Sequence, residues 1–486
     1  MANDLKQKTV SGVTWSFLEQ VLARGINFVI GIVLARLLTP EDYGLVGMLG
    51  IFIGLSNVFI DGGFASALIQ CKNRTQEDLS TVQIINVGMS ILLYAILFVC
   101  APMIARFYEQ PLLTSITRIL SLSLIIGAFS SVSGTLLSIR IDFKTKAYIS
   151  IIKSVLTGII AIICAYCGMG VWALVVQGLT AAALTTLTTV AFVRWFPKTG
   201  FSKQSFKKLF SYGSKLLAAT LISNIYDNIY SLVIGKTVSA AAVGQYSRAG
   251  HFPQLGNGVI AGMINRVAFP VLSRIQDDDE RLLRVYDKYI QISCFLIFPI
   301  LMGLCGCARP VILLLLTEKW AECIPLMQIL CFACLFTGIT TINLNLLYVK
   351  GRSDLVLKLE IIKKVIAFSI VFITAFFSVT VMCWGQVAYS IIALGLNTFY
   401  TKKILGYGLF AQLKTILPYL VIGLAVLAES MLICHFIQND WAALSLSVGV
   451  CGISYIAIHA LARSYAFSEA RGYLYSLFHR KNNGDA

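Results

Sequence analysis

Residues 26–60, INFVIGIVLARLLTPEDYGLVGMLGIFIGLSNVFI, place a short polar turn between two long apolar runs. The two apolar runs on either side of this turn extend over residues 11–38 and 43–69. A helix of about 20 apolar residues crosses the roughly 30 Å hydrocarbon core of a bilayer, because each residue adds about 1.5 Å. The stretch therefore predicts two transmembrane helices joined by a tight turn.

The same pattern recurs along the 486 residues, of which 57% are hydrophobic and 13% charged. A soluble domain carries roughly a quarter charged residues, so this composition indicates a membrane protein. We expect an all-α membrane protein with about fourteen transmembrane helices. The expected spans are 11–38, 43–69, 79–107, 112–138, 147–168, 171–193, 209–234, 244–272, 288–316, 322–348, 355–378, 381–401, 415–436 and 441–462.

The formal charge of +16 is distributed by loop. Lys and Arg gather in the N-terminal tail, the even-numbered loops and the C-terminal tail, and the odd-numbered loops hold few of them. By the positive-inside rule, both termini are expected in the cytoplasm, and the protein in the inner (cytoplasmic) membrane. The basic residues form no patch with interleaved aromatics, so we expect no nucleic-acid partner.

An internal repeat is visible when the sequence is shifted by 200 residues. LARLLTPEDYG then aligns with IGKTVSAAAVG, pairing Arg36 with Lys236, Thr39 with Ser239 and Gly44 with Gly244. Six spans precede the middle of the chain and six follow it, which predicts two related six-helix lobes around a central cavity. The expected parts are an N-lobe at 1–200, a C-lobe at 201–412, and two further helices with a cytoplasmic tail at 413–486.

Arg24 is the strongest candidate for a functional charge. It lies 13 residues beyond Ser11, about 20 Å along the first helix, where a charge is costly unless it faces a cavity or a partner. Helical spacing places it on one polar face with Ser16, Gln20, Asn27 and Gly31. This face predicts a cation that lines a wet cavity; the alternative is a permanent ion pair with Glu19 or Asp61.

Three acidic residues, Glu19, Asp61 and Asp227, are candidates for ion coupling or gating. Asp61 precedes Gly62 and Gly63, which indicates either a broken helix or close packing, and a purely structural pairing of Asp61 stays open. Asp227 lies on a polar stripe of the seventh span and aligns with Asn27 in the repeat. Two cations, Lys215 and Arg248, lie nearer helix ends, so they face the cavity or snorkel to the interface.

A cationic wet cavity with apolar walls suits an amphiphile that has an anionic head, because an arginine fork binds phosphate while acyl chains stay in lipid. No P-loop motif is present, so the energy source is expected to be an ion gradient, of Na⁺ or H⁺, or consumption of the product. We expect no other cofactor. The CxxC pairs beginning at Cys164 and Cys331 lie in apolar sequence and indicate helix packing rather than a metal site.

Three stretches, VLARLLTPEDYGLVGM at 33–48, DGGFASALIQ at 61–70 and FPVLSRIQDDDERLLR at 269–284, resemble a known family. They are similar to the polysaccharide transporters of the multidrug/oligosaccharidyl-lipid/polysaccharide (MOP) superfamily, above all Wzx-type exporters of colanic and teichuronic acid type. The resemblance implies a flippase that moves undecaprenyl-diphosphate-linked oligosaccharide to the outer leaflet by alternating access. It also implies that Arg24 first and Arg248 second hold the diphosphate.

The resemblance further implies a transporter that is not an enzyme, with membrane lipids and the polysaccharide biosynthesis machinery as partners. Two other functions stay open. The first is a cation-coupled multidrug exporter of the same superfamily, whose cavity would favour carboxylates over Arg24. The second is a membrane enzyme acting on the same lipid carrier, which would need an acid/base or metal-binding constellation on an exposed loop.

Overall fold

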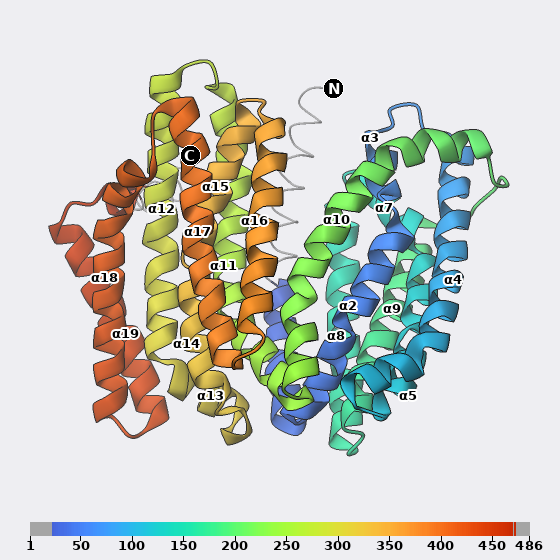
Figure 1. Cartoon of the computed structure of the whole chain (residues 1–486), viewed down its shortest axis with the longest axis horizontal. Coiled ribbons are helices and arrows are strands. Elements are labelled where there is room, and N and C mark those ends of the chain that lie inside the picture. The colour runs from blue at the N-terminus through green and yellow to red at the C-terminus, as the bar shows by residue number, and fades with distance from the viewer. Residues whose placement is uncertain (1–21, 470, 473–486) are drawn as a thin grey trace, which may run out of the picture. The chain divides into compact units, whose positions relative to one another are not determined.

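The computed structural model describes residues 22–469, 471 and 472, and the regular elements within these residues are helices (Figure 1). They pack into two compact units, one that ends at Gly244 and one that begins at Gln245. The first unit holds a helix at 22–37, then α2 (Pro40–Asp61), α3 (Phe64–Gln70), α4 (Gln76–Tyr108), α5 (Leu112–Leu120), α6 (Leu122–Ala128), α7 (Ser131–Ile139), α8 (Phe143–Tyr166), α9 (Val171–Val193) and α10 (Lys203–Thr237).

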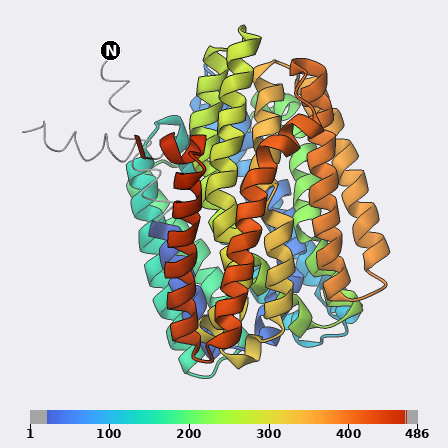
Figure 2. The ribbon, with the colours of Figure 1, turned by 90° about the vertical axis from the view of Figure 1, so that its left-hand side faces the viewer.

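The helix α11 (Ala240–Arg274) contains the boundary between the units. The second unit continues with α12 (Asp279–Gly306), α13 (Ala308–Leu316), the short 3₁₀ helix η1 (Glu318–Trp320), α14 (Cys323–Cys334), α15 (Thr337–Val349), α16 (Ser353–Thr374), α17 (Val379–Leu405), α18 (Leu409–Phe436) and α19 (Asp440–Leu461). Within this unit α18 packs along α12 on one side and along α19 on the other (Figure 2).

Ten helices of the described chain are long and apolar enough to cross a membrane. An eleventh span results if the bent pair Leu112–Ala128 and Ser131–Ile139, which meets at 45°, is counted as one. The fold is therefore that of a multi-pass helical membrane protein, as the apolar runs predict. The total of about fourteen spans and the cytoplasmic placement of both termini stay predictions.

The expected span 112–138 is divided into three short helices, α5, α6 and α7, instead of one. Serine hydroxyls lie at the divisions and donate to carbonyls three residues back: Ser121 to Arg118 at 3.3 Å, Ser123 to Leu120 at 2.6 Å and Ser130 to Gly127 at 3.1 Å. Such local bonds compete with the regular helical ladder. The helix therefore breaks at serines, which the average hydropathy of the run does not reveal.

The expected span 288–316 is also divided, at Cys307, between α12 and α13. Pro310 has no N–H to donate to the carbonyl of Gly306, so the ladder cannot run through this position. The expected span 322–348 is one candidate membrane span, Cys323–Val349, and its helix is interrupted only at Leu335 and Phe336, between α14 and α15.

The Gly62–Gly63 pair ends α2, and both alternatives raised by its sequence hold. Both residues have left-handed backbone angles, φ 53° and φ 73°, which glycine adopts without steric cost. A Cβ on Gly63 would also meet the backbone of Gly213 on α10. The pair therefore breaks the helix and lets α10 pack closely on it.

The two aligned turns of the repeat have the same local structure. Thr39 caps α2, because its hydroxyl accepts from the Asp42 amide at 3.2 Å while the Asp42 carboxylate accepts from the Thr39 amide at 2.9 Å. At the aligned position, the Ser239 hydroxyl accepts from the Ala242 amide at 3.1 Å. A hydroxyl thus begins the following helix in both copies, which supports the repeat; the lobe boundaries stay a prediction.

The basic loop at 194–202 is held on the start of α4 by hydrogen bonds. The Trp195 indole donates to Gln76 at 3.0 Å, and the Ser202 amide donates to the Thr81 hydroxyl at 3.0 Å. Just beyond the loop, Lys208 of α10 forms an ion pair with the buried Asp78 at 3.1 Å. These contacts fix the start of α10 against the start of α4.

Candidate functional site

A polar cavity of about 380 Å³ lies within the first unit, between α2, α3 and α10. The residues that line it are Gly54, Asn57, Val58, Asp61, Gly63, Ser66, Leu216, Leu217, Thr220 and Asn224. Asp61 meets Thr220 and Asn224 in this cavity although they are distant in the chain. Thr220 belongs to the polar stripe of the seventh span, Asn224 lies beside that stripe, and Asp227 of the same stripe does not line the cavity.

Glycines on α2 allow α10 to approach this cavity closely. A Cβ on Gly54 would lie 2.6 Å from the Asn224 side-chain oxygen, and one on Gly50 would lie 3.0 Å from that of Asn228. The Asn228 amide also donates to the Asn224 carbonyl at 2.9 Å. The amide side chains are therefore packed between the two helices, where small residues let polar groups face a neighbouring backbone.

Asp61 is the one ionisable group among the described residues that line the cavity. It is the last residue of α2 and its side chain is exposed. A carboxylate among hydroxyl and amide groups suits a proton or a hydrated cation and disfavours a phosphate. This cavity can thus take part in ion coupling, and neither Arg24 nor Lys215 lines it.

Arg24 lies half-buried on the helix at 22–37, whose neighbour is α8. On that helix, the Asn27 amide donates to the Ser154 hydroxyl of α8 at 3.3 Å, and Ile30 fills the space beside Gly158. Asn27 therefore joins the helix at 22–37 to α8, whereas the sequence predicts that Asn27 lines a cavity. Glu19 and Gln20 lie outside the described residues.

The other candidates lie on α10 and α11. Lys215 and Asp227 are exposed on α10, in the first unit. Arg248 is half-buried on α11, in the second unit. Whether these side chains bind substrate stays a prediction.

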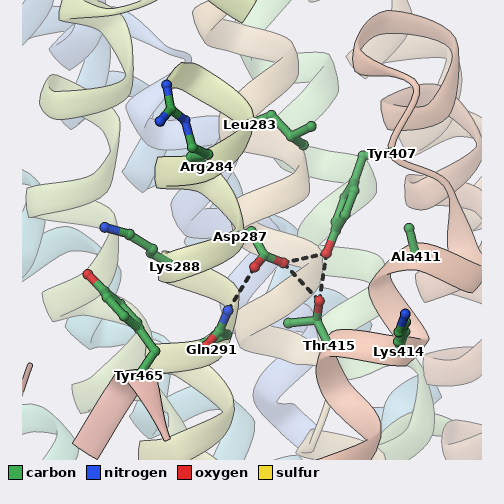
Figure 3. A pocket seen from close by; sticks show the side chains of 10 residues that line it. All are labelled: Leu283, Arg284, Asp287, Lys288, Gln291, Tyr407, Ala411, Lys414, Thr415 and Tyr465. Atoms are coloured by element: carbon green, nitrogen blue, oxygen red, sulfur yellow. Dashed lines mark hydrogen bonds between the residues drawn. The ribbon is translucent and has the colours of Figure 1, made fainter. Parts of the chain in front are cut away.

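A second pocket, of about 530 Å³, lies within the second unit between α12, α18, Tyr407 in the turn before α18, and Tyr465 beyond the end of α19 (Figure 3). Asp287 lies at its centre and accepts hydrogen bonds from the hydroxyls of Tyr407 and Thr415, the latter at 2.9 Å, and from the Gln291 amide at 2.7 Å. Burial and the bond to Asp287 raise the pKa of Tyr407 well above its usual range, so the phenol stays a donor.

Sequence reasoning missed this pocket. Asp287 stands one residue before the expected span 288–316, where a charge costs little, so its position in the sequence does not indicate a site. The available signal was RVYDKYIQ at 284–291, in which Asp287 and Gln291 are one helical turn apart and lie on one face.

A buried polar network holds the helices around this pocket in place. The Gln412 amide donates to the Tyr286 hydroxyl at 2.9 Å and to the Thr401 hydroxyl at 3.2 Å, and the Asn343 amide donates to Gln412 at 3.3 Å. Tyr286 in turn donates to Asn343. These four residues join α12, α15, α17 and α18 through bonds that leave little freedom in their relative position.

Metal-binding groups are not gathered in the part of the chain that is described: no three His, Cys, Asp or Glu side chains there are placed to hold an ion together. Of the two CxxC pairs, Cys331 is buried and Cys334 is partly buried on α14, and Cys164 and Cys167 flank the end of α8.

The fold and these polar sites define a multi-pass helical membrane protein. Residues 33–325 match the family described as "Polysaccharide biosynthesis protein", more than half of the chain, and the protein belongs to this family. The resemblance noted from its motifs is thereby confirmed.

Two relatives and one solved structure place the chain more closely. The lipopolysaccharide biosynthesis protein WzxC of Escherichia coli (strain K12) is 27% identical over 457 residues, covering 93% of this chain and 88% of WzxC. The teichuronic acid biosynthesis protein TuaB of Bacillus subtilis (strain 168) is 23% identical, covering 96% of this chain and 98% of TuaB. The lipid II flippase MurJ, in an inward closed conformation, is 14% identical with a TM-score of 0.77, over 92% of this chain and 98% of MurJ. At that identity, the likeness to MurJ concerns the fold.

Proposed function

We propose that this protein is a flippase that moves undecaprenyl-diphosphate-linked oligosaccharide from the cytoplasmic to the outer leaflet by alternating access. The observation that carries the proposal is its membership of the polysaccharide biosynthesis family, together with similarity to WzxC along nearly the whole chain. The fold shared with a protein described as a lipid II flippase supports it.

The physical task fits the candidate residues. Moving a glycan diphosphate into hydrocarbon costs free energy, because the charged group loses its hydration. The polyprenyl chain is apolar and already lies in the lipid. The headgroup therefore needs a wet path with cations to hold the diphosphate, and the tail does not. In this proposal Arg24 holds the diphosphate, Arg248 assists it, and Lys215, Gln20 and Asn27 line the path.

The proposed arrangement has about fourteen helices in the inner membrane with both termini in the cytoplasm. Two lobes, at 1–200 and 201–412, enclose the path, and residues 413–486 add two helices and a tail. The polysaccharide biosynthesis machinery supplies the lipid-linked glycan and takes the product. Nothing in this scheme asks the chain to make or break a covalent bond, so it is a transporter and not an enzyme.

Ion coupling is assigned to Asp61, with Glu19 and Asp227 as further candidates. The cavity beside α2 and α10 supports this role, because the described residues of its polar lining include the Asp61 carboxylate and no cation. Such a carboxylate can bind Na⁺ or H⁺ in one state and release it in the other.

The same acidic cavity favours one alternative function, a cation-coupled multidrug exporter. Deletion of the gene in its own host separates the two. A flippase predicts loss of one surface polysaccharide, restored by the wild-type gene, and unchanged drug susceptibility. Raised susceptibility to cationic drugs with normal surface polysaccharide would favour the exporter.

A further inference from the structure

The pocket around Asp287 has a pattern of charge that the movement of a lipid-linked glycan does not use. Asp287 lies at its centre, and three cations, Arg284, Lys288 and Lys414, are arranged around it (Figure 3). The Asp287 carboxylate is oriented by three neutral donors, so its negative charge is fixed in place but not neutralised. One negative centre within a positive rim is complementary to a ligand that carries a cation and an anion close together.

The depth of the pocket relative to the expected membrane indicates which kind of ligand can reach it. Asp287 and Thr415 stand at the starts of the expected spans 288–316 and 415–436, and Tyr465 follows the end of 441–462 by three residues. The pocket therefore lies at an expected membrane–water interface, on the side where basic residues are concentrated. This is the level at which phospholipid headgroups lie.

The side chains that surround Asp287 are of the types found at a membrane–water interface. The Lys288 ammonium lies 4.6 Å from the ring centre of Tyr465, which holds the cation beside an aromatic ring of the kind that is enriched at interfaces. Arg284 and Lys414 are exposed, on α12 and α18 respectively. Basic pockets between transmembrane helices on the cytoplasmic side are recognised sites for phosphate-bearing headgroups.

We propose that this pocket binds the headgroup of an aminophospholipid, with the primary ammonium at Asp287 and the phosphate at the cations of the rim, Arg284 and Lys288 on one side of Asp287 or Lys414 on the other (Figure 3). A purely anionic headgroup would place negative charge against Asp287, and a quaternary ammonium could not donate a hydrogen bond to it. The volume of about 530 Å³ is within the range of pockets that hold small polar ligands. The bound lipid is a membrane component and not the transported cargo.

The test uses the purified full-length protein titrated with phosphatidylethanolamine, phosphatidylglycerol or phosphatidylcholine, with bound lipid counted by native mass spectrometry. We expect phosphatidylethanolamine to bind about tenfold more tightly than the other two, the effect of one charge-assisted contact. Asp287→Asn should remove this preference and leave phosphatidylcholine binding unchanged. Equal binding of the three lipids, or tightest binding of phosphatidylglycerol, would overturn the proposal.

A second variant is needed because Asp287 also joins helices through its hydrogen bonds. The double variant Arg284→Ala, Lys414→Ala leaves those bonds intact and should weaken phosphatidylethanolamine binding about tenfold. Arg281→Ala, an exposed arginine on the same helix outside the pocket lining, is the matched control and should have no effect. An equal loss in the control would contradict the site.

A final arm separates a lipid from a soluble phosphate ester. Phosphoethanolamine is added in solution to protein in phosphatidylcholine nanodiscs, and thermal stabilisation is compared with that in nanodiscs containing phosphatidylethanolamine. Stabilisation by the lipid alone supports the proposal. Equal stabilisation by the soluble compound would assign the pocket to a cytosolic ligand instead.

Discussion

Gly44 of α2 lies directly against the backbone carbonyl of Ala240, so that a Cβ at position 44 would fall on that oxygen. The reciprocal contact joins Gly244 to the carbonyl of Pro40. Because 40 aligns with 240 and 44 with 244 in the repeat, the two turns meet as the two sides of a two-fold interface do. Glycine is required in both copies because backbone meets backbone.

Substitution of Gly44 by alanine should destabilise the protein by about 1–3 kcal/mol, the usual cost of forcing extra volume into a packed site. The measurement is thermal unfolding of the purified protein in detergent. Gly88→Ala on α4, where no atom lies within 4 Å of the added Cβ, is the control and should be neutral or slightly stabilising. Equal stability of the two variants would show that the turns do not pack in this way.

Removal of the charge at Asp61 should impair transport without impairing the fold. Asp61→Asn keeps the size of the side chain and its place in the cavity, so we expect a fall in glycan export of about tenfold at normal protein level, since intramembrane carboxylates serve as ion-binding groups. Glu77→Gln, at an exposed carboxylate in the first turn of α4, is the control. Wild-type export by Asp61→Asn would leave Asp61 with a structural role.

The buried network around Gln412 should contribute to stability and not to the path of the glycan. Gln412→Leu leaves the Asn343 amide without its buried acceptor and removes the bond that the Tyr286 hydroxyl accepts, while the bond from Tyr286 to Asn343 remains, at a cost of about 1–3 kcal/mol. Thermal unfolding should show this loss, while Lys403→Ala, at an exposed lysine of α17, should not. A Gln412→Leu protein as stable as wild type would mean that water replaces the lost bonds.

The sequence predicts helices well where apolar runs end in local stop signals. The expected span 171–193 coincides with α9, which begins after Gly170 at φ 54° and ends before Arg194 at φ 50°. The expected spans 112–138 and 288–316, which are divided in the structure, show no such signal in their average hydropathy where the helix breaks. The serines of 112–138 and Pro310 act through individual hydrogen bonds, and an average over a window does not register them.

Candidate residues were predictable as types but not as groups. Asp61 stands out in its sequence because it interrupts an apolar run, yet Thr220 and Asn224 reach its cavity from another part of the chain. No spacing rule connects them, because the crossing of α2 and α10 depends on glycines at 50 and 54. The site around Asp287 is not predictable from spacing, because the hydroxyls that bond to Asp287 come from Tyr407 and Thr415, beyond the end of α17.

The central claim, that this chain moves a lipid-linked glycan and uses Arg24 to do so, is tested most directly in proteoliposomes. A labelled undecaprenyl-diphosphate-linked oligosaccharide is placed in the vesicles, and a membrane-impermeant glycosidase outside reports its transfer. We expect transfer that depends on the protein, a loss of about tenfold or more with Arg24→Ala, partial activity with Arg24→Lys, and full activity with the exposed-residue control Arg106→Ala. Absence of transfer by the wild-type protein, or Arg24→Ala transfer equal to wild type, would contradict the account.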